Sequence, residues 1–238
     1  MARIILHNVN IKFLIKKCLY LPSLFLRYIK VHLSGLRSTE HVFTKVYKEN
    51  SWGDPESRSG SGSSLAQTNI VRPELKALVE NLAATSMLDI PCGDFNWLSK
   101  VDLGLDYIGA DIVQNLVDEN AKKYGNNNRR FIKLDLIQDK LPQVDIIFCR
   151  DVLVHFNNKQ IFQAIKNIKR SRSTYLLTTT FPSVNKNINV ATGEWRALDL
   201  CKPPFNFPAP IRLIIEQSTE ENELSSSKCL ALWKISDI

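Results

Sequence analysis

The sequence predicts an open, doubly wound α/β fold whose mostly parallel, seven-stranded sheet ends in an antiparallel hairpin. From residue 73 onward, short apolar runs alternate with segments of helical periodicity, as in a series of βα units. The last two apolar runs, 211–216 and 228–235, follow a long Pro-rich loop with no helical pattern between them. Two such runs are typical of antiparallel strands that close a sheet.

Five βα units precede the hairpin. Pro73 suits the first turn of a helix that runs to about residue 84, and Gly125 suits the end of a later one. The continuous apolar run at 145–149 indicates a strand covered on both faces. We expect the other strands at 86–90, 107–110, 131–134 and 175–180, and helices at 73–84, 95–100, 113–124 and around Ile161, Ile165 and Ile168.

Length and charge describe one α/β domain with a basic arm. A chain of 238 residues can bury a full core. The net charge of +7 resides in residues 1–37, which hold seven Lys and Arg side chains and no acid, whereas the remainder holds 24 basic and 24 acidic residues. Because that body is neutral overall and has no evident basic stripe, we expect no nucleic-acid partner.

The arm, residues 1–37, mixes its charges with apolar residues. Its longest uncharged run, Cys18–Leu26, has nine residues and contains Pro22, so it is too short to span a bilayer. A secretory cleavage pattern is missing. Two amphipathic helices broken near Pro22 would either pack on the domain or a partner, or lie on an anionic membrane surface. A mitochondrial targeting peptide fits less well, because the arm is neither Ser-rich nor Arg-rich.

Residues 38–72 form a segment of their own before the domain at 73–238. Ser57–Ser64 reads SRSGSGSS, which alone would be a flexible linker, but the sequence on either side is too mixed for one. We therefore expect a cap or lid over the site, with the glycines as hinges. A phosphate-binding P-loop is excluded because its Lys and following Ser or Thr are absent.

The five cysteines indicate neither a zinc site nor a disulfide framework. Their number is odd and none is spaced as CxxC. We expect no metal, and a reducing, cytoplasmic location. The cysteines are Cys18, Cys92, Cys149, Cys201 and Cys229.

The strongest motif lies between two apolar runs. The first run ends in Asp89, a tight turn with Gly93 follows, and the second run ends in Asp111, 18 residues after that glycine. In nucleotide-binding α/β folds this turn approaches the ligand, and the second acid bonds a ribose. The turn also carries Asp94, and its acids would repel a pyrophosphate. The pattern therefore favours a cationic ligand without a pyrophosphate.

This arrangement resembles the class I S-adenosylmethionine-dependent methyltransferases over about residues 73–235, and implies their Rossmann-like fold and methyl donor. The sulfonium and ammonium of that donor match the acids. Many members have GxGxG where this chain has Pro91-Cys92-Gly93-Asp94. The Trp52-Gly53 pair and the SGSGS run ahead of PCGDFNW also resemble methyltransferases found among bacterial glycan-modifying genes.

The resemblance assigns donor-binding roles to the strand ends. The first loop would wrap the methionine part, Asp111 would hold the ribose hydroxyls and Asp135 would contact the adenine amine. An Asp at a strand end can also simply cap the next turn, and Asp94 lies where it could favour a helix N-terminus. The expected donor-binding residues are Asp89, Pro91, Cys92, Gly93, Asp94, Asp111, Ile112, Asp135, Leu136 and Arg150.

Three residues are candidates for the base that removes a proton from the acceptor. Asp151 and His155 follow the fourth strand in RDVLVHF, 150–156, and would share one face if that segment were helical. Glu194 lies in the loop 183–210, which we expect to wall the acceptor pocket. Alternatively, His155 packs under the sheet edge, Asp151 pairs with Arg150 or caps a helix, and Glu194 forms a surface salt bridge with Arg196.

Three functions compete. We favour methyl transfer to a hydroxyl of a small-molecule or glycan acceptor. A nicotinamide-dependent oxidoreductase would use a similar sheet, but the GxGxxG motif is missing and the closing hairpin argues against it. A membrane- or partner-docking protein with a degenerate site would explain the basic arm, but not the intact acids.

Overall fold

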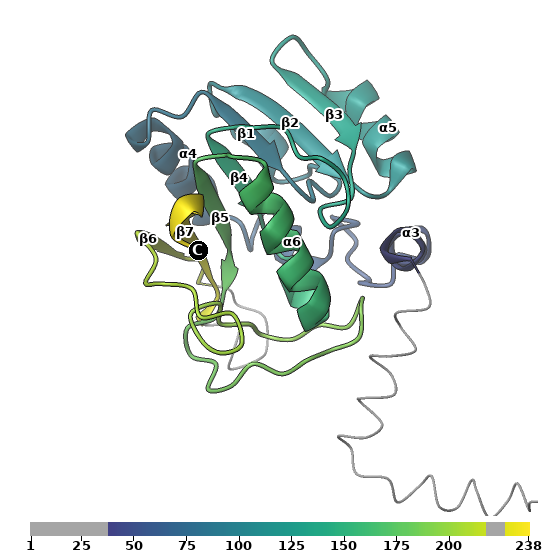
Figure 1. Cartoon of the computed structure of the whole chain (residues 1–238). Helices are drawn as coiled ribbons and strands as arrows, with labels where there is room; N and C mark the ends of the chain where they lie inside the picture. Colours follow the sequence, from purple (N-terminus) through teal and green to yellow (C-terminus); the bar gives the residue numbers. More distant parts are fainter. Residues whose placement is uncertain (1–37, 218–226) are drawn as a thin grey trace, which may run out of the picture.

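The computed structural model describes residues 38–217 and 227–238, so the expectations for the arm at 1–37 fall outside the described residues (Figure 1). One sheet contains seven strands. They are β1 (Ser86–Asp89), β2 (Asp106–Asp111), β3 (Arg129–Lys133), β4 (Ile146–Cys149), β5 (Tyr175–Thr180), β6 (Arg212–Ile215) and β7 (Cys229–Lys234). The described helices are α3 (Thr39–Glu49), α4 (Val71–Asn81), α5 (Gln114–Tyr124) and α6 (Asn158–Arg170).

The strand order is β3-β2-β1-β4-β5-β7-β6. The strands from β1 to β5 are parallel, and Met87 of β1 pairs with Tyr107 on one side and with Ile146 on the other. The chain order reverses between β1 and β4, and ligands of open α/β sheets bind beyond the carboxyl ends of the strands at such a point. Strand β7 is antiparallel to both β5 and β6, which confirms the predicted closing hairpin.

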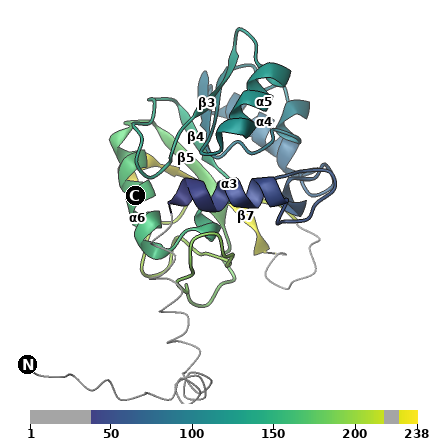
Figure 2. The same cartoon turned by 90° about the vertical axis from the view of Figure 1, so that its right-hand side faces the viewer.

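Two apolar clusters, one on each face, hold the sheet between helices. Successive side chains of a strand point to opposite faces. Thus Met87 and Ile146 join the cluster with α4 and α5, whereas Leu88 and Ile147 join the cluster with α6. Figures 1 and 2 show α6 on one side of the sheet, α4 and α5 on the other, and α3 lying across the carboxyl ends of the strands.

Local sequence accounts for most helix limits. Asn157 begins α6 with a reciprocal capping box, in which its side chain accepts from the Gln160 N–H and the Gln160 side chain accepts from the Asn157 N–H. Helix α5 ends at Tyr124, before Gly125 as predicted. Helix α4 begins two residues earlier than expected, so Pro73 is its third residue, still in the first turn.

Two segments that follow strands of the sheet form only short 3₁₀ turns. In place of a helix at 95–100 there is only a 3₁₀ turn, Leu98–Lys100, because Phe95 adopts a φ of 55°. The segment after β4 also forms just a 3₁₀ turn, Leu153–His155, and Asp151 has a φ of 56°. Asp151 and His155 therefore do not share a helix face.

The loop after β5 explains the shape of the segment after β4. Gly193 N–H donates to the carbonyl of His155, and Arg196 N–H donates to that of Val154. The Arg196 side chain donates to the carbonyl of Leu153 at 2.7 Å. These carbonyls would otherwise accept from the next turn of a helix, so contacts distant in sequence replace the helix.

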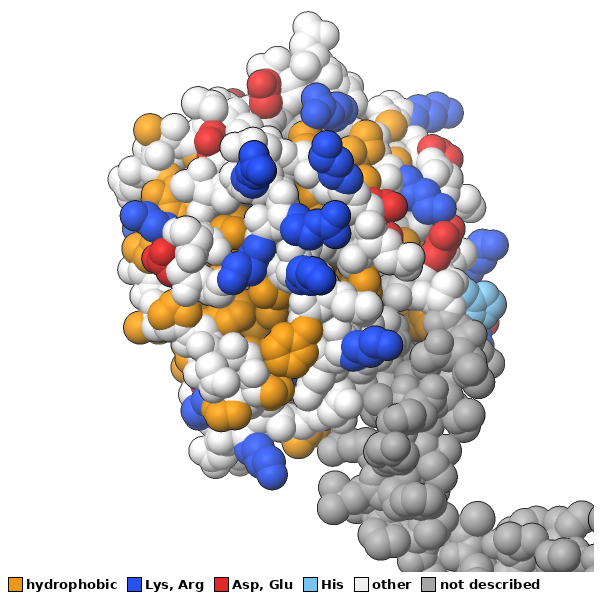
Figure 3. Space-filling view, viewed as in Figure 1, with side chains coloured by type: hydrophobic (Ala, Val, Ile, Leu, Met, Phe, Trp, Pro, Cys, Tyr) orange, Lys and Arg blue, Asp and Glu red, His pale blue; other side chains and the backbone are white. Residues whose placement is uncertain are grey.

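The basic side chains of α6 gather on its outer face (Figure 3). Helix α6 contains no acid, and its four basic residues, Lys159, Lys166, Lys169 and Arg170, are all exposed. We call these four residues the basic face. The described ranges contain no helix that is long and apolar enough to cross a bilayer.

Candidate functional site: two adjoining cavities at the strand ends

A cavity with about 1050 Å³ of empty space, part of it open to solvent, lies at the carboxyl ends of β1 to β4. Helix α3 forms its other wall with Phe43, Val46 and Tyr47. We call it the main cavity. All of the predicted donor-binding residues except Asp94 line it: Asp89, Pro91, Cys92, Gly93, Asp111, Ile112, Asp135, Leu136 and Arg150.

Backbone contacts fix the first loop, residues 90–97, over this cavity. Cys92 N–H donates to the Ala110 carbonyl at 2.8 Å, and the buried Asn120 amide donates to the Gly93 carbonyl at 2.7 Å. Gly93 has a φ of 55°, and a Cβ there would lie 2.2 Å from Ser59 Oγ. The loop therefore needs glycine both for its backbone conformation and for the close approach of residue 59.

Asp111 is buried at the base of the main cavity. Its Oδ1 accepts from Val113 N–H at 2.9 Å and its Oδ2 accepts from Gly93 N–H at 3.3 Å. Burial raises the pKa of this carboxyl to about 6, although these backbone hydrogen bonds oppose the shift. Each carboxylate oxygen keeps a further lone pair, so Asp111 can accept two more hydrogen bonds, as a diol would require.

Asp89 is the second buried carboxyl of the main cavity. It accepts a hydrogen bond from the Tyr107 hydroxyl, and burial raises its pKa to about 8. Within the described ranges, neither Asp89 nor Asp111 forms an ion pair. Two buried carboxyls without a cationic partner favour a positively charged ligand in the space that they line.

Asp135 follows β3 at the rim of the main cavity. Its Oδ1 accepts from Ile137 N–H at 2.8 Å, and its Oδ2 accepts from the Gln138 side chain at 3.0 Å. These contacts shape the turn after the strand and leave the half-buried carboxylate beside the lining residue Leu136.

Asp94 lies outside the main cavity and holds the segment at 57–59. Its carboxylate accepts from the Ser57 hydroxyl at 2.9 Å and from Arg58 N–H at 2.8 Å. Its own N–H donates to Ser59 Oγ at 3.0 Å. The charge of Asp94 is therefore satisfied by donors of residues 57–59.

Residues 39–63 contact several parts of the domain around the cavity. The Tyr47 hydroxyl donates to Glu119 at 3.0 Å, and Lys133 pairs with Glu40 at 2.7 Å. Phe43, Val46 and Tyr47 were not predicted to line the cavity, although their spacing on one helical face is a signal that could have identified them.

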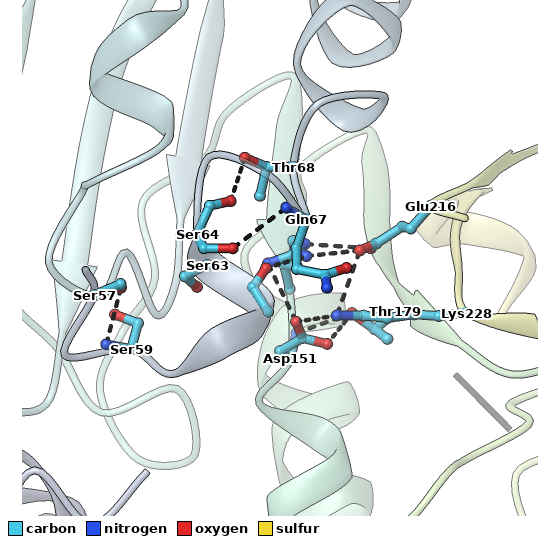
Figure 4. A network of polar contacts seen from close by, with 12 residues as sticks. Ser57, Ser59, Ser63, Ser64, Gln67, Thr68, Asp151, Thr179, Glu216 and Lys228 are labelled. Carbon is cyan, nitrogen blue, oxygen red and sulfur yellow. Dashed lines mark hydrogen bonds and ion pairs between the residues drawn. The ribbon is translucent and has the colours of Figure 1, made fainter. Parts of the chain in front are cut away.

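Four charged side chains, Arg150, Asp151, Glu216 and Lys228, form a cluster beside the main cavity; Figure 4 shows three of them, Asp151, Glu216 and Lys228, labelled. We call it the charge cluster. Arg150 donates to Glu216 at 2.6 Å, and Lys228 donates to Asp151 at 2.6 Å. Burial alone would raise the pKa of Asp151, but the positive charges of Lys228 and Arg150 hold it below its usual range. Arg150 also donates to the Gly62 carbonyl at 2.8 Å, which connects the cluster to the Gly- and Ser-rich segment at 57–64.

A second cavity, with about 780 Å³ of empty space that is partly open to solvent, adjoins the first. Trp52, Ser59, Asp151 and His155 line both cavities. The remaining walls come from Gly60, Ser61, Gly62, Phe181, Trp195 and Lys228.

His155 lies where the two cavities meet. Its ring stacks on Trp52 with centroids 5.2 Å apart, and its Nδ1 lies 3.3 Å from the Glu194 carbonyl oxygen. A carbonyl only accepts, so this contact places the proton on Nδ1 and leaves the lone pair on Nε2. Burial lowers the pKa of His155 to about 4, so the ring is neutral at pH 7.

Glu194 lines neither cavity. Its side chain is exposed and accepts from Ala191 N–H at 3.1 Å. The loop at 183–210 instead contributes Trp195 to the second cavity, and Phe181 precedes that loop. Lys228 was not foreseen, because it lies 77 residues from Asp151 in the sequence.

Comparison with known proteins identifies the fold. No protein-family profile matches the sequence, and no curated protein matches it. Human N-acetylserotonin methyltransferase with bound S-adenosylmethionine (SAM) superposes with a TM-score of 0.58 at 11% identity, over 83% of this chain and 60% of that one. Magnesium protoporphyrin IX methyltransferase from Synechocystis PCC 6803, with SAM, gives 0.55 at 15%, over 83% and 97%.

A third solved structure agrees. The N-methyltransferase NodS from Bradyrhizobium japonicum WM9, with S-adenosylhomocysteine (SAH), gives a TM-score of 0.53 at 13% identity, over 79% of this chain and 97% of that one. The chain therefore has the fold of the class I SAM-dependent methyltransferases, which confirms the predicted fold class.

Proposed function

We propose that this protein transfers a methyl group from SAM to a hydroxyl group of a small-molecule or glycan acceptor. The observation that carries the proposal is the main cavity, where Asp89, Gly93 and Asp111 meet at the topological switch point. The structural neighbours that contain SAM or SAH support the choice of donor.

The residues of the main cavity fit this donor. Asp111 keeps lone pairs for a ribose diol, and the buried carboxyl of Asp89 suits a ligand with positive charges. The ionised carboxylate of Asp111 would repel a pyrophosphate. When bound, SAM supplies a methyl group on a positively charged sulfur, and the loss of that methyl leaves a neutral thioether.

His155 is the residue that we propose to accept the acceptor's proton. Its neutral ring has the Nε2 lone pair available at the junction of the cavities. A conjugate acid with a pKa of about 4 makes it a weak base. Positioning of the two reactants, which can contribute about 7–11 kcal/mol, therefore supplies most of the rate. Asp151 is held by Lys228 and Arg150, and we assign it to hydrogen bonding of the acceptor.

Residues 38–72 are proposed to act as a lid over both cavities. Gly53 and Gly60, with φ angles of 66° and 90°, flank the piece that Asp94 holds. Rotation at these two glycines would lift residues 54–59 and break the contact of Arg58 with Tyr47 of α3. Closure would exclude water from the reacting groups.

The basic arm at 1–37 is proposed to direct the protein to an anionic membrane surface from the cytoplasm. Thr39, at the start of α3, accepts a hydrogen bond from the Gln160 side chain in the first turn of α6. The arm therefore joins the domain beside the basic face, so both would contact the same surface.

Calorimetry with SAH and with NAD tests the proposed donor. The proposal predicts that SAH binds with one site per chain and that NAD does not bind. Binding of NAD without binding of SAH would favour the oxidoreductase, and binding of neither would favour a docking protein with a degenerate site.

A further inference from the structure

Two exposed tryptophan side chains line the second cavity. Trp52 and Trp195 are 38% and 45% exposed, although large apolar side chains are usually covered. Trp195 packs edge-on against Phe181, with ring centroids 5.8 Å apart. Exposed aromatic rings on the walls of a cavity are typical of a site that takes a ligand with an apolar face.

The polar part of this cavity carries no net charge. Asp151 and Lys228 line it, and both belong to the charge cluster, whose two cations and two anions balance. Lys228 is paired with both Asp151 and Glu216, at 2.6 and 3.4 Å, so it offers little attraction to an anionic ligand. Asp151 is 28% exposed, and its Oδ1, which accepts from the Thr179 hydroxyl at 3.1 Å, keeps one lone pair for a hydroxyl donor.

The side chains at the junction with the main cavity would determine how a ligand is oriented in the second cavity. His155 and Asp151 line both spaces, with Trp52 stacked on the imidazole. A ligand between Trp52 and Trp195 would place one edge beside His155 and Asp151. Hydroxyl groups on that edge could donate to the His155 Nε2 and to the remaining lone pair of Asp151, whereas a purely apolar ring would leave both lone pairs without a donor.

We propose that the second cavity is the acceptor site and that it takes an uncharged saccharide unit. The ring C–H faces contact Trp52 and Trp195, and one hydroxyl group points toward His155. This inference rests on the proposed methyltransferase function, and it narrows the acceptor from small molecules in general to neutral sugars. Charged sugars are disfavoured by the balanced charge cluster, and planar aromatic acceptors with a single hydroxyl group by the two polar side chains at the junction.

Saturation-transfer NMR on the full-length protein with saturating SAH tests the acceptor class. The probes are the methyl glycosides of glucose, galactose, mannose and rhamnose, methyl glucuronoside as the charged counterpart, and phenol as the planar one. We expect transfer to ring C–H protons of at least one neutral glycoside, stronger than transfer to the glucuronoside or to phenol. Stronger transfer to either of the latter two, or transfer to no probe, would overturn the proposal.

Variants of Trp195 test whether the glycosides bind in the second cavity. Trp195→Ala should weaken glycoside binding roughly 2- to 10-fold, and Trp195→Phe should restore most of it, because an aromatic face is what the ring contacts. Phe162→Ala is the matched control, since Phe162 is a similarly exposed aromatic residue on α6, outside both cavities. Equal glycoside affinity in the wild type and in Trp195→Ala would overturn the assignment of the second cavity as the acceptor site.

The same protein samples show whether the proposed methyl donor or the proposed acceptor class is wrong. SAH affinity is measured by calorimetry on each variant and should not change with Trp195. Glycoside binding without SAH binding would reject the proposed donor, whereas SAH binding with no glycoside binding would reject only the acceptor class.

Discussion

Replacing Gly93 with alanine should loosen the contact between the first loop and the lid. The added Cβ would lie 2.2 Å from Ser59 Oγ, and the residue would keep a φ of 55°. A non-glycine residue in this conformation costs about 1–3 kcal/mol. The displaced Ser59 would also disturb its hydrogen bonds with Asp94.

Urea unfolding measures the loss in the free energy of unfolding, which we expect at about 1–3 kcal/mol from the backbone conformation alone. Ser59→Ala removes the hydroxyl that the new methyl group meets. The double variant should therefore lose less stability than the two single variants together, with a coupling of about 0.5–3 kcal/mol. SAH affinity should fall in Gly93→Ala, because the loop lines the main cavity. Strict additivity, or unchanged stability in Gly93→Ala, would refute this account of the glycine.

Three further predictions concern protonation and the arm. Affinity for SAM should rise with pH by up to about tenfold per pH unit toward pH 8 and then level off. The reason is that a cationic ligand favours the ionised form of Asp89, whose pKa is about 8 in the free protein. Calorimetry should show a flatter dependence of SAM affinity on pH for Asp89→Asn. His155→Gln should lower turnover about 10²- to 10⁴-fold with donor affinity unchanged. Glu194→Gln should turn over at the wild-type rate. Equal turnover in the two variants would exclude His155 as the base. A chain that begins at Thr39 should bind SAH, but only the full-length chain should float with phosphatidylglycerol vesicles, and flotation of neither would exclude membrane contact.

His155 also makes stability depend on pH. Its pKa is about 4 in the folded protein, against an ordinary value of 6.5. Between pH 4 and pH 6.5 the unfolded chain binds more protons at this residue than the folded protein does. The contribution of neutral His155 to the free energy of unfolding is therefore fully present above pH 6.5 and is lost as the pH falls toward 4. Urea unfolding of His155→Gln should show a smaller loss of stability over this range than the wild type.

The strand ends could be predicted from sequence because their signals are local. An apolar run followed by an acid locates the end of a parallel strand, and the sheet then brings Asp89, Asp111 and Asp135 to one edge. Every predicted donor-binding residue that belongs to this pattern lines the main cavity. Asp94 does not, because its carboxylate accepts hydrogen bonds from residues 36 and 37 positions earlier in the sequence.

The second cavity could be predicted only in part, because it depends on contacts between distant segments. The sequence predicts an acceptor pocket walled by the segment after β4 and by the loop 183–210, and Asp151, His155 and Trp195 from these segments line the second cavity. The lining residues Trp52 and Lys228 follow α3 and precede β7, and no local pattern connects them to His155. The 3₁₀ turn at Leu153–His155 was also missed, since the donors that replace the helix lie about 40 residues later.

The most direct test of the methyl-donor site is the affinity of SAH for Asp111→Ala, measured by calorimetry beside Asp106→Ala. Asp106 is an exposed acid at the opposite end of the same strand, so it controls for loss of charge on β2. Thermal unfolding of both variants checks that they fold. We predict that Asp111→Ala loses a charge-assisted hydrogen-bonded pair worth about 1.5–3 kcal/mol, or about 10- to 150-fold in affinity, while Asp106→Ala binds as the wild type does. Unchanged affinity in a folded Asp111→Ala variant would contradict the assignment of the main cavity to the methyl donor.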